Sequence, residues 1–413
     1  MWKMPRVAGL GLSCAFLYTS EVMLNTVRTI VRNHAMLCVA AVAALVTSVF
    51  AMPSWEELGA SIDVRVIALL FCLMAAVAGL VAHGALSRIA RRLIAHASNA
   101  RKLYALLVFA PFFVSMLVTN DVALLAFVPL TVTTLLMADR RGDIAHVAVA
   151  QAVAANLGSM VTPFGNPQNL FIYLTYDVSA WEFACAIAPY CALSFVLIAL
   201  RCVAWPKTPV AISTSEGKRA PVTAEAPDAT RPASRSRVFS SERSWCAFYL
   251  VLFVFGVLAV VRLVPWQIAC VVVALCVALL DRTTLKRVDW SLLATFVCFF
   301  VFSGNMARIP AIEGALTWAV GQAPFATSLL ASQVISNVPS AVLLSHFTGD
   351  WHALLLGVDL GGLGTPVASL ASLIALRAFR LVPGSTTREF MVPFLRLNVA
   401  FLVCLIVAYV LIG

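Results

Sequence analysis

Long apolar stretches with few or no charges constrain the fold of this chain more than any other feature. They are about as long as a helix that crosses the hydrocarbon layer of a membrane, although the shortest would need flanking residues. These stretches are 35–52, 64–81, 183–200, 247–261, 268–280 and 390–412. Of 413 residues, 62% are hydrophobic and only 12% are charged, well outside the balance of a soluble domain. The sequence therefore predicts an all-α polytopic membrane protein.

Residues 206–244 interrupt the apolar pattern. They are rich in Pro, Ala, Ser and Thr, which is typical of a flexible linker. The linker predicts two halves of similar size, 33–205 and 245–413, as expected of an internal repeat. Residues 1–32 place a basic flank before an apolar run, and Glu and Arg follow it without a clean cleavage site. We interpret them as an N-terminal cytoplasmic segment rather than a signal peptide.

Basic residues gather in segments that we place in the cytoplasm, because short cytoplasmic loops keep an excess of Lys and Arg. These segments are the linker, 88–102, 282–287 and 377–388. The placement is consistent only if the apolar stretches 103–138 and 325–347 each enter and leave the membrane on the same side. We therefore expect two re-entrant helical hairpins in addition to about 10–11 membrane spans.

Both expected hairpins carry a polar turn in the middle of an apolar sequence. The turn reads Thr-Asn-Asp at 119–121 in the first hairpin and Ser-Asn-Val at 336–338 in the second. An unpaired polar group costs several kcal/mol in hydrocarbon, so such turns persist only where they are buried in protein or line a wet cavity. Two turns that enter from opposite faces would meet near the middle of the membrane.

Each hairpin is followed by a second interruption that is too rich in Gly, Pro and Asn to continue a helix. These breaks are 156–169 and 359–366, and both contain a Thr-Pro pair. The order of hairpin, Asn turn and broken helix thus occurs twice, in halves that the charge pattern orients oppositely. This arrangement predicts the binding site of a transporter built from inverted repeats.

At these motifs the chain resembles the ion transporter superfamily, which contains the arsenite permease and sodium/proton antiporter group and the citrate and dicarboxylate transporter group. Segments 119–124, 162–169 and 332–339 carry the similarity, which extends to the bacterial anion permeases of that superfamily. The resemblance implies two inverted repeats, each with a re-entrant hairpin and an unwound transmembrane helix, around a site at the middle of the membrane. It also implies a homodimer that works by an elevator-like displacement.

The resemblance further implies that residues at the hairpin tips contact the substrate and that the backbone around them holds coupling sodium ions. The candidate substrate-binding residues are Thr119, Asn120, Thr162, Asn166, Ser336, Asn337 and Thr365. The candidate ion-coupling residues are Asp121, Gly158, Ser159, Gly165, Gly361 and Gly364. Helix N-termini after the polar turns would point partial positive charge at an anion, while unwound carbonyls suit a hard cation such as sodium.

Several of these residues have a second interpretation. Asp121 is costly at membrane depth and is therefore expected to be functional, but it could carry a proton, ligate sodium, or cap the second hairpin helix. Each glycine alone could serve helix packing, whereas their clustering beside Pro and Thr favours unwound backbone. Asp121 and Val338 stand where dicarboxylate members have Thr after Ser-Asn, so dicarboxylate specificity is not carried over.

We expect a secondary active transporter of a small anion, a carboxylate or an oxyanion, coupled to sodium or protons. A sodium/proton antiporter is the alternative, because Asp121 would serve it equally. A channel and an intramembrane enzyme are remote alternatives: the sequence lacks HExxH, GxSxG and P-loop motifs, and no enzymatic activity is predicted.

The expected cofactors and partners follow from this interpretation. No cofactor is expected other than sodium ions, and the expected partners are a small anion, the lipid bilayer and a second copy of the chain. No nucleic acid is expected, because the net charge of +10 follows the cytoplasmic loops. The resemblance leaves room for a separate ATPase subunit, which we do not favour. We place the protein in a bacterial inner membrane with its N-terminus in the cytoplasm.

Overall fold

The computed structural model describes residues 34–209 and 241–412, and all of its regular elements there are helical. The predicted N-terminal segment and most of the linker lie outside the described residues. The six apolar stretches all form helices close to the expected bounds. These helices are α2 (Ala35–Ala51), α4 (Val64–Ala82), α10 (Ala180–Val203), α11 (Glu242–Val260), α12 (Trp266–Leu280) and α20 (Thr387–Ile412). The predicted all-helical fold class is therefore confirmed.

Several helices have the length and composition of membrane spans. Within the described residues, five helices have these properties alone, namely α4, α10, α11, α20 and α7 (Asn120–Met137). A sixth could form from α14 (Trp290–Met306) and α15 (Pro310–Gln322), which meet at an angle of 97°. These apolar helices fit a polytopic membrane protein, while the expected total of about 10–11 spans stays a prediction.

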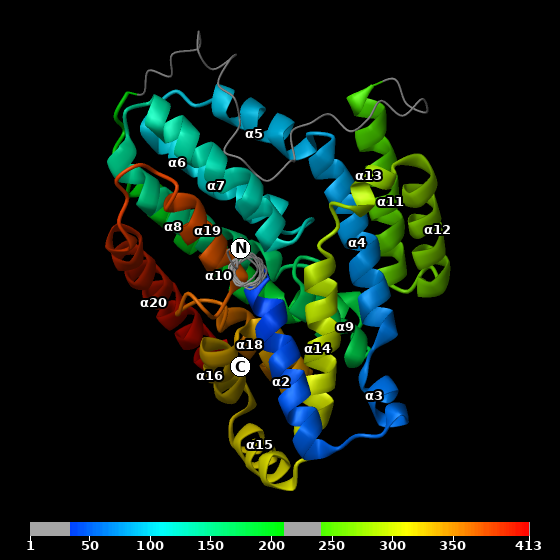
Figure 1. Ribbon diagram of the computed structural model, residues 1–413. Coiled ribbons are helices and arrows are strands. Elements are labelled where there is room, and N and C mark those ends of the chain that lie inside the picture. The colour runs from blue at the N-terminus through cyan, green and yellow to red at the C-terminus, as the bar shows by residue number, and fades with distance from the viewer. Residues whose placement is uncertain (1–33, 210–240, 413) are drawn as a thin grey trace, which may run out of the picture.

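The helices form two groups that lie side by side (Figure 1). In the first group, which we call the panel, α2 packs along α14, and α4 packs against both α11 and α12. The second group contains the expected hairpins and most of both broken helices together with α10 and α20, while residues 167–175 of the first broken helix contact α4. Short elements connect these helices: α3 (Trp55–Ser61), α5 (Ala85–Ala95), η1 (Arg141–Asp143) and α13 (Arg282–Leu285).

A helical hairpin occurs at both places where the sequence predicts one. In the first, α6 (Ala100–Val114) and α7 are joined by residues 115–119. In the second, α16 (Pro324–Ile335) and α17 (Asn337–Leu344) are joined at Ser336 alone. Helices α5 and α15, which precede the two hairpins, lie at opposite ends of the molecule (Figure 1). The re-entrant character of the hairpins stays a prediction.

Both predicted helix breaks are present. Residues 160–166 separate α8 (Ile144–Ser159) from α9 (Pro167–Thr175), and residues 361–369 separate α18 (Trp351–Leu360) from α19 (Leu370–Phe379). Hairpin, broken helix and long final helix therefore follow one another in both halves. The two-fold relation between the halves, and their division at 33–205 and 245–413, remain predictions.

Local chemistry explains why the broken helices stop and restart. Asn166 caps α9 by accepting a hydrogen bond from the backbone of Asn169, and Pro167 occupies the first helical position. Ser369 caps α19 in a similar way. Gly364 has a φ of +109°, and a Cβ there would overlap the side-chain oxygen of Gln333. Only glycine suits this point of the second break.

A buried polar network fastens the panel helices at one end. Asp281, just beyond α12, lies 3.2 Å from His83 Nε2 at the end of α4 and accepts a hydrogen bond from the Tyr249 hydroxyl of α11 at 2.9 Å. It also accepts bonds from Thr283 and Thr284. Burial by itself would raise the pKa of the Asp281 carboxyl, but these hydrogen bonds outweigh it and hold the pKa below its usual range.

Asp281→Ala is expected to lower the free energy of unfolding by about 3 kcal/mol, because it leaves several buried donors without an acceptor. The depressed pKa means that the carboxylate stabilises the fold at all pH values above about 4 and loses this effect only in stronger acid. Thermal unfolding in detergent between pH 3 and pH 8 tests both statements. Asp177→Asn, which breaks an exposed ion pair with Arg262, is the control and should change little. An unchanged melting temperature for Asp281→Ala would contradict this role.

Candidate functional site

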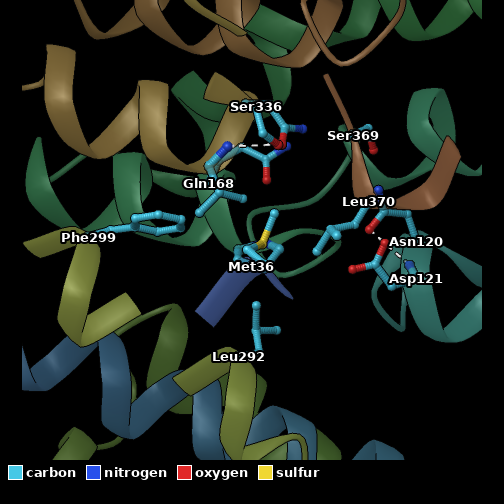
Figure 2. A pocket seen from close by; sticks show the side chains of 12 residues that line it. Met36, Asn120, Asp121, Gln168, Leu292, Phe299, Ser336, Ser369 and Leu370 are labelled. Carbon is cyan, nitrogen blue, oxygen red and sulfur yellow. Dashed lines mark hydrogen bonds between the residues drawn. The ribbon is translucent and has the colours of Figure 1, made fainter. Parts of the chain in front are cut away.

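Four helix N-termini converge on one cavity. The cavity is lined by residues at the starts of four helices, 120–121 of α7, 167–168 of α9, 337–338 of α17 and 369–370 at α19. Met36 of α2 and two residues of α14, Leu292 and Phe299, lie on its panel side (Figure 2). The volume of the cavity is about 20 Å³. The two predicted hairpin tips therefore do meet, together with the restarts of both broken helices.

The first hairpin tip is tied to both breaks through Asn156. Asn120 Nδ2 and Ser369 Oγ donate to the side-chain oxygen of Asn156, at 2.8 and 3.0 Å. Asn156 Nδ2 in turn donates to the carbonyl of Gly362 at 3.4 Å. The Asn120 oxygen accepts the backbone N–H of Asp121 at 3.0 Å. Asn120 thus lies at the cavity wall with both ends of its amide engaged.

The second hairpin tip is anchored to the second break. Both Ser336 Oγ and the backbone N–H of Asn337 donate to the carbonyl of Ala368, at 3.2 and 3.1 Å. The Asn337 oxygen accepts the backbone N–H of Val338 at 2.9 Å. Ser336 has φ 76° and ψ 158°, a combination that costs a non-glycine residue about 1–3 kcal/mol. Strained backbone of this kind is typical of functional sites.

Asp121 points into the cavity without a side-chain partner. Figure 2 shows it beside Asn120 and Leu370. Its Oδ1 atom is buried, and no hydrogen bond to that atom is made within the described part of the chain. Asp121 lies in the first turn of α7, where an acid also stabilises the helix through its charge, so its three expected roles stay predictions.

Asp359 is a second buried carboxylate, which the sequence analysis did not select although it begins the second break. Its Oδ1 accepts hydrogen bonds from Asn166 Nδ2 at 3.3 Å and from Gln168 Nε2 at 3.2 Å. Its Oδ2 atom is buried and has no hydrogen-bond partner among the described residues. Asn166 Nδ2 also reaches Ser159 Oγ at 3.3 Å. The end of α18 is thereby joined to the break of the first half.

Other predicted site residues lie behind the cavity wall. Thr162 Oγ1 donates to the carbonyl of Met116, which ties the first break to the first hairpin turn. Gly158 lies in the last turn of α8, where a Cβ would overlap the carbonyl of Phe112, so it serves close packing against α6. The predicted residues that do not line the cavity are Thr119, Gly158, Ser159, Thr162, Gly165, Asn166, Gly361, Gly364 and Thr365. Their roles as substrate or ion contacts stay predictions.

Gln333 holds the second break in shape. It lies in segment 332–339, for which the sequence predicted no role of this side chain. Its Nε2 donates to the carbonyls of Gly361 and Leu363, at 2.7 and 2.8 Å. Its side-chain oxygen accepts the backbone N–H of Thr365 at 2.9 Å. One side chain from the second hairpin thus satisfies three backbone groups that the broken helix leaves unpaired.

Gln333→Leu is expected to lower the free energy of unfolding by about 3 kcal/mol and to reduce transport strongly, because three backbone groups lose their partner. Melting temperature and uptake, measured on the same preparation, test this expectation. Gln322→Leu makes the same change at an exposed position of α15 and should leave both quantities near wild type. Normal stability together with normal uptake in Gln333→Leu would show that the break does not depend on this side chain.

Comparison with known proteins identifies a transporter family and several similar membrane proteins. Residues 22–357 match the model of the citrate transporter family. Over 332 residues the chain is 31% identical to inner membrane protein YbiR of Escherichia coli. This aligned region covers 79% of this chain and 82% of YbiR. Over 285 residues it is 30% identical to the uncharacterized transporter MJ0456 of Methanocaldococcus jannaschii, covering 68% and 71% of the two chains.

A shorter match reaches a plant protein. Over 165 residues the chain is 31% identical to the silicon efflux transporter LSI3 of Oryza sativa subsp. japonica, covering 39% of this chain and 33% of that one. The family match spans most of the chain, both hairpins and the first break. It confirms the resemblance to the ion transporter superfamily and indicates a transporter rather than an enzyme. The chain is therefore a membrane protein that belongs to the citrate transporter family.

Proposed function

We propose that this protein is a secondary active transporter that moves a small anion, a carboxylate or an oxyanion, by alternating access and couples it to sodium or protons. The observation that carries the proposal is the convergence of four helix N-termini on one cavity. Each helix N-terminus carries roughly half an elementary positive charge. Four of them together favour an anion.

The cavity wall also supports coupling to a cation. Among the residues that line the cavity, Asp121 is the only ionisable one, and the others contribute amide, hydroxyl and apolar groups. An ionised Asp121 repels an anion in the same small space, since charges interact strongly away from water. A proton or a sodium ion that neutralises this carboxylate removes the repulsion. Binding of the cation then favours binding of the anion.

The family and the cavity lining support the proposed substrate class. The family is named for citrate, a carboxylate. The amide and hydroxyl groups of the cavity wall can donate hydrogen bonds to the oxygen atoms of a carboxylate or an oxyanion.

The orientation follows from charge. The basic segments predict a cytoplasmic N-terminus, and the relative from Escherichia coli is named as an inner membrane protein. We propose a bacterial inner membrane as the location and, from the resemblance alone, a homodimer.

Uptake by purified protein in liposomes tests the proposed function. Citrate, succinate, sulfate and arsenite are supplied outside, and a sodium gradient and a pH gradient are imposed in separate experiments. Accumulation of one anion under one gradient, abolished by an ionophore that collapses that gradient, is the expected result. Protein-free liposomes provide the baseline.

Two other results would change the assignment. Proton movement that is driven by a sodium gradient and needs no anion would replace the proposal by a sodium/proton antiporter, for which Asp121 is the supporting observation. A channel would be indicated if the anion moves rapidly down its own gradient but does not accumulate under a sodium gradient or a pH gradient.

A further inference from the structure

We propose that Asp359 is a second carboxylate, besides Asp121, against which a coupling cation, a proton or a sodium ion, is held during transport. This inference rests on the proposed function and gives the coupling a site behind the cavity wall. It does not depend on the predicted sodium contacts of the glycine-rich backbone.

The surroundings of Asp359 leave its negative charge uncompensated. The residue is 6% exposed, Oδ1 accepts two amide donors, and Oδ2 is buried without a partner in the described ranges. A buried carboxylate without a cation is costly, and two neutral donors compensate it only in part.

Among the described residues, no basic side chain supplies the missing charge. Helices α8, α9, α16, α17 and α20 pack against α18, and none of their described residues forms an ion pair with Asp359. The titratable residues on these helices are His146 of α8, Tyr173 of α9, and Arg388, Glu389, Arg396, Cys404 and Tyr409 of α20. A mobile cation is therefore the remaining source of positive charge.

The first half shows that the position does not need a charge for structural reasons. Asn156 precedes Leu-Gly in the first break as Asp359 does in the second. Asn156 accepts a hydrogen bond from Ser369, the cap of α19, and Asp359 accepts one from Asn166, the cap of α9. The neutral amide of Asn156 therefore makes one bridge between the halves, and the carboxylate of Asp359 makes the other. Because an amide is sufficient for such a bridge, the negative charge of Asp359 is available to bind a cation.

Gln168 connects Asp359 to the anion cavity. It lines the cavity at the start of α9, as Figure 2 shows, and its Nε2 donates to Asp359. A cation bound to Asp359 weakens the hydrogen bond that Asp359 accepts from Gln168. The cation therefore alters a side chain of the cavity wall that the anion contacts. The occupancy of the two sites is therefore linked by one hydrogen bond.

The test compares two kinds of transport by Asp359→Asn, which keeps the side-chain shape and an oxygen acceptor. Counterflow of the anion that wild type carries, measured without an ion gradient, is expected to continue. Accumulation driven by the coupling gradient is expected to fall about tenfold or more, within the usual range of coupling between two sites. Separate sodium and pH gradients identify the cation. Asp177→Asn makes the same chemical change at an exposed site and should accumulate the anion like wild type.

The outcomes separate this inference from the proposed function. Undiminished gradient-driven accumulation by Asp359→Asn would overturn the role of Asp359 while leaving a coupled transporter. Failure of wild type to accumulate any anion under either gradient would overturn both.

A second measurement needs no substrate. In detergent, the melting temperature of wild type is expected to rise when sodium replaces choline or when the pH is lowered from 8 to 6, and Asp359→Asn should lose that rise. Equal responses in wild type and Asp359→Asn in both conditions would overturn the inference.

Discussion

Asn120→Ala is expected to abolish transport while the protein still folds and inserts. The substitution removes the 2.8 Å hydrogen bond to Asn156 and the 3.0 Å bond from the backbone of Asp121, which together place the first hairpin tip at the cavity. A displacement of a binding group by about 1 Å commonly costs about a hundredfold in rate. The cost in stability is smaller, about 1–3 kcal/mol, because Asn156 keeps its bond from Ser369.

The same result is expected for Asn337→Ala at the second tip, where the backbone of Val338 loses its acceptor. Uptake per inserted molecule is the measurement, with size-exclusion profiles to establish folding. Asn99→Ala is the control, because Asn99 caps α6 away from the cavity and its loss costs about 1 kcal/mol without touching the site. Normal uptake by both tip variants would remove the hairpin tips from the binding site.

Gly158→Ala is expected to prevent most of the protein from reaching a stable fold. A Cβ at this position would overlap the carbonyl oxygen of Phe112 and lie 2.6 Å from Ser115 Oγ. The backbone of α6 cannot move aside without also moving the hairpin turn, so the cost exceeds about 3 kcal/mol, the upper end for a typical overpacked site. Melting temperature and the yield of monodisperse protein in detergent check this expectation.

The same substitution on an open helix face provides the comparison. Gly314 lies in α15 with no atom within 4 Å of an added Cβ. Gly314→Ala should therefore be neutral or stabilise the helix by up to about 1 kcal/mol. If Gly158→Ala unfolds at the same temperature as Gly314→Ala, the close approach of α8 to α6 is not what fixes their packing.

The sequence predicted the helices and the polar turns well because both leave local signals. An apolar stretch such as 64–81 has the length of a span whatever surrounds it, and α4 follows it to within one residue. A Ser-Asn or Thr-Asn pair inside an apolar hairpin is equally visible without knowledge of its neighbours. The cavity accordingly contains Asn120, Asp121, Ser336 and Asn337, as expected for hairpin tips that meet.

The residues that the sequence analysis missed depend on partners far away in the chain. Asp359 gains its importance from Asn166, which lies 193 positions earlier, and Asn156 gains its importance from Ser369, 213 positions later. In the sequence, Gln333 is an ordinary polar residue of an apolar helix. Its importance follows only from its three backbone partners. No local pattern indicates such pairs. Similarly, the clustering of glycines favoured unwound backbone at Gly158, whereas the structure places this residue in the last turn of α8, where the carbonyl of Phe112 leaves no room for a Cβ.

The two hairpins are alike in order but differ in how their turns are held. Residues 115–119 join α6 to α7 and are tied at several points, since Leu117 and Val118 donate to the carbonyl of Val114 and Met116 accepts a bond from Thr162. Ser336 alone joins α16 to α17, has strained backbone, and is held by bonds to Ala368 and from Ser340. The first tip is therefore anchored to the first break and the second tip to the second. In the alternating access that we propose, each tip would move together with the broken helix of its own half.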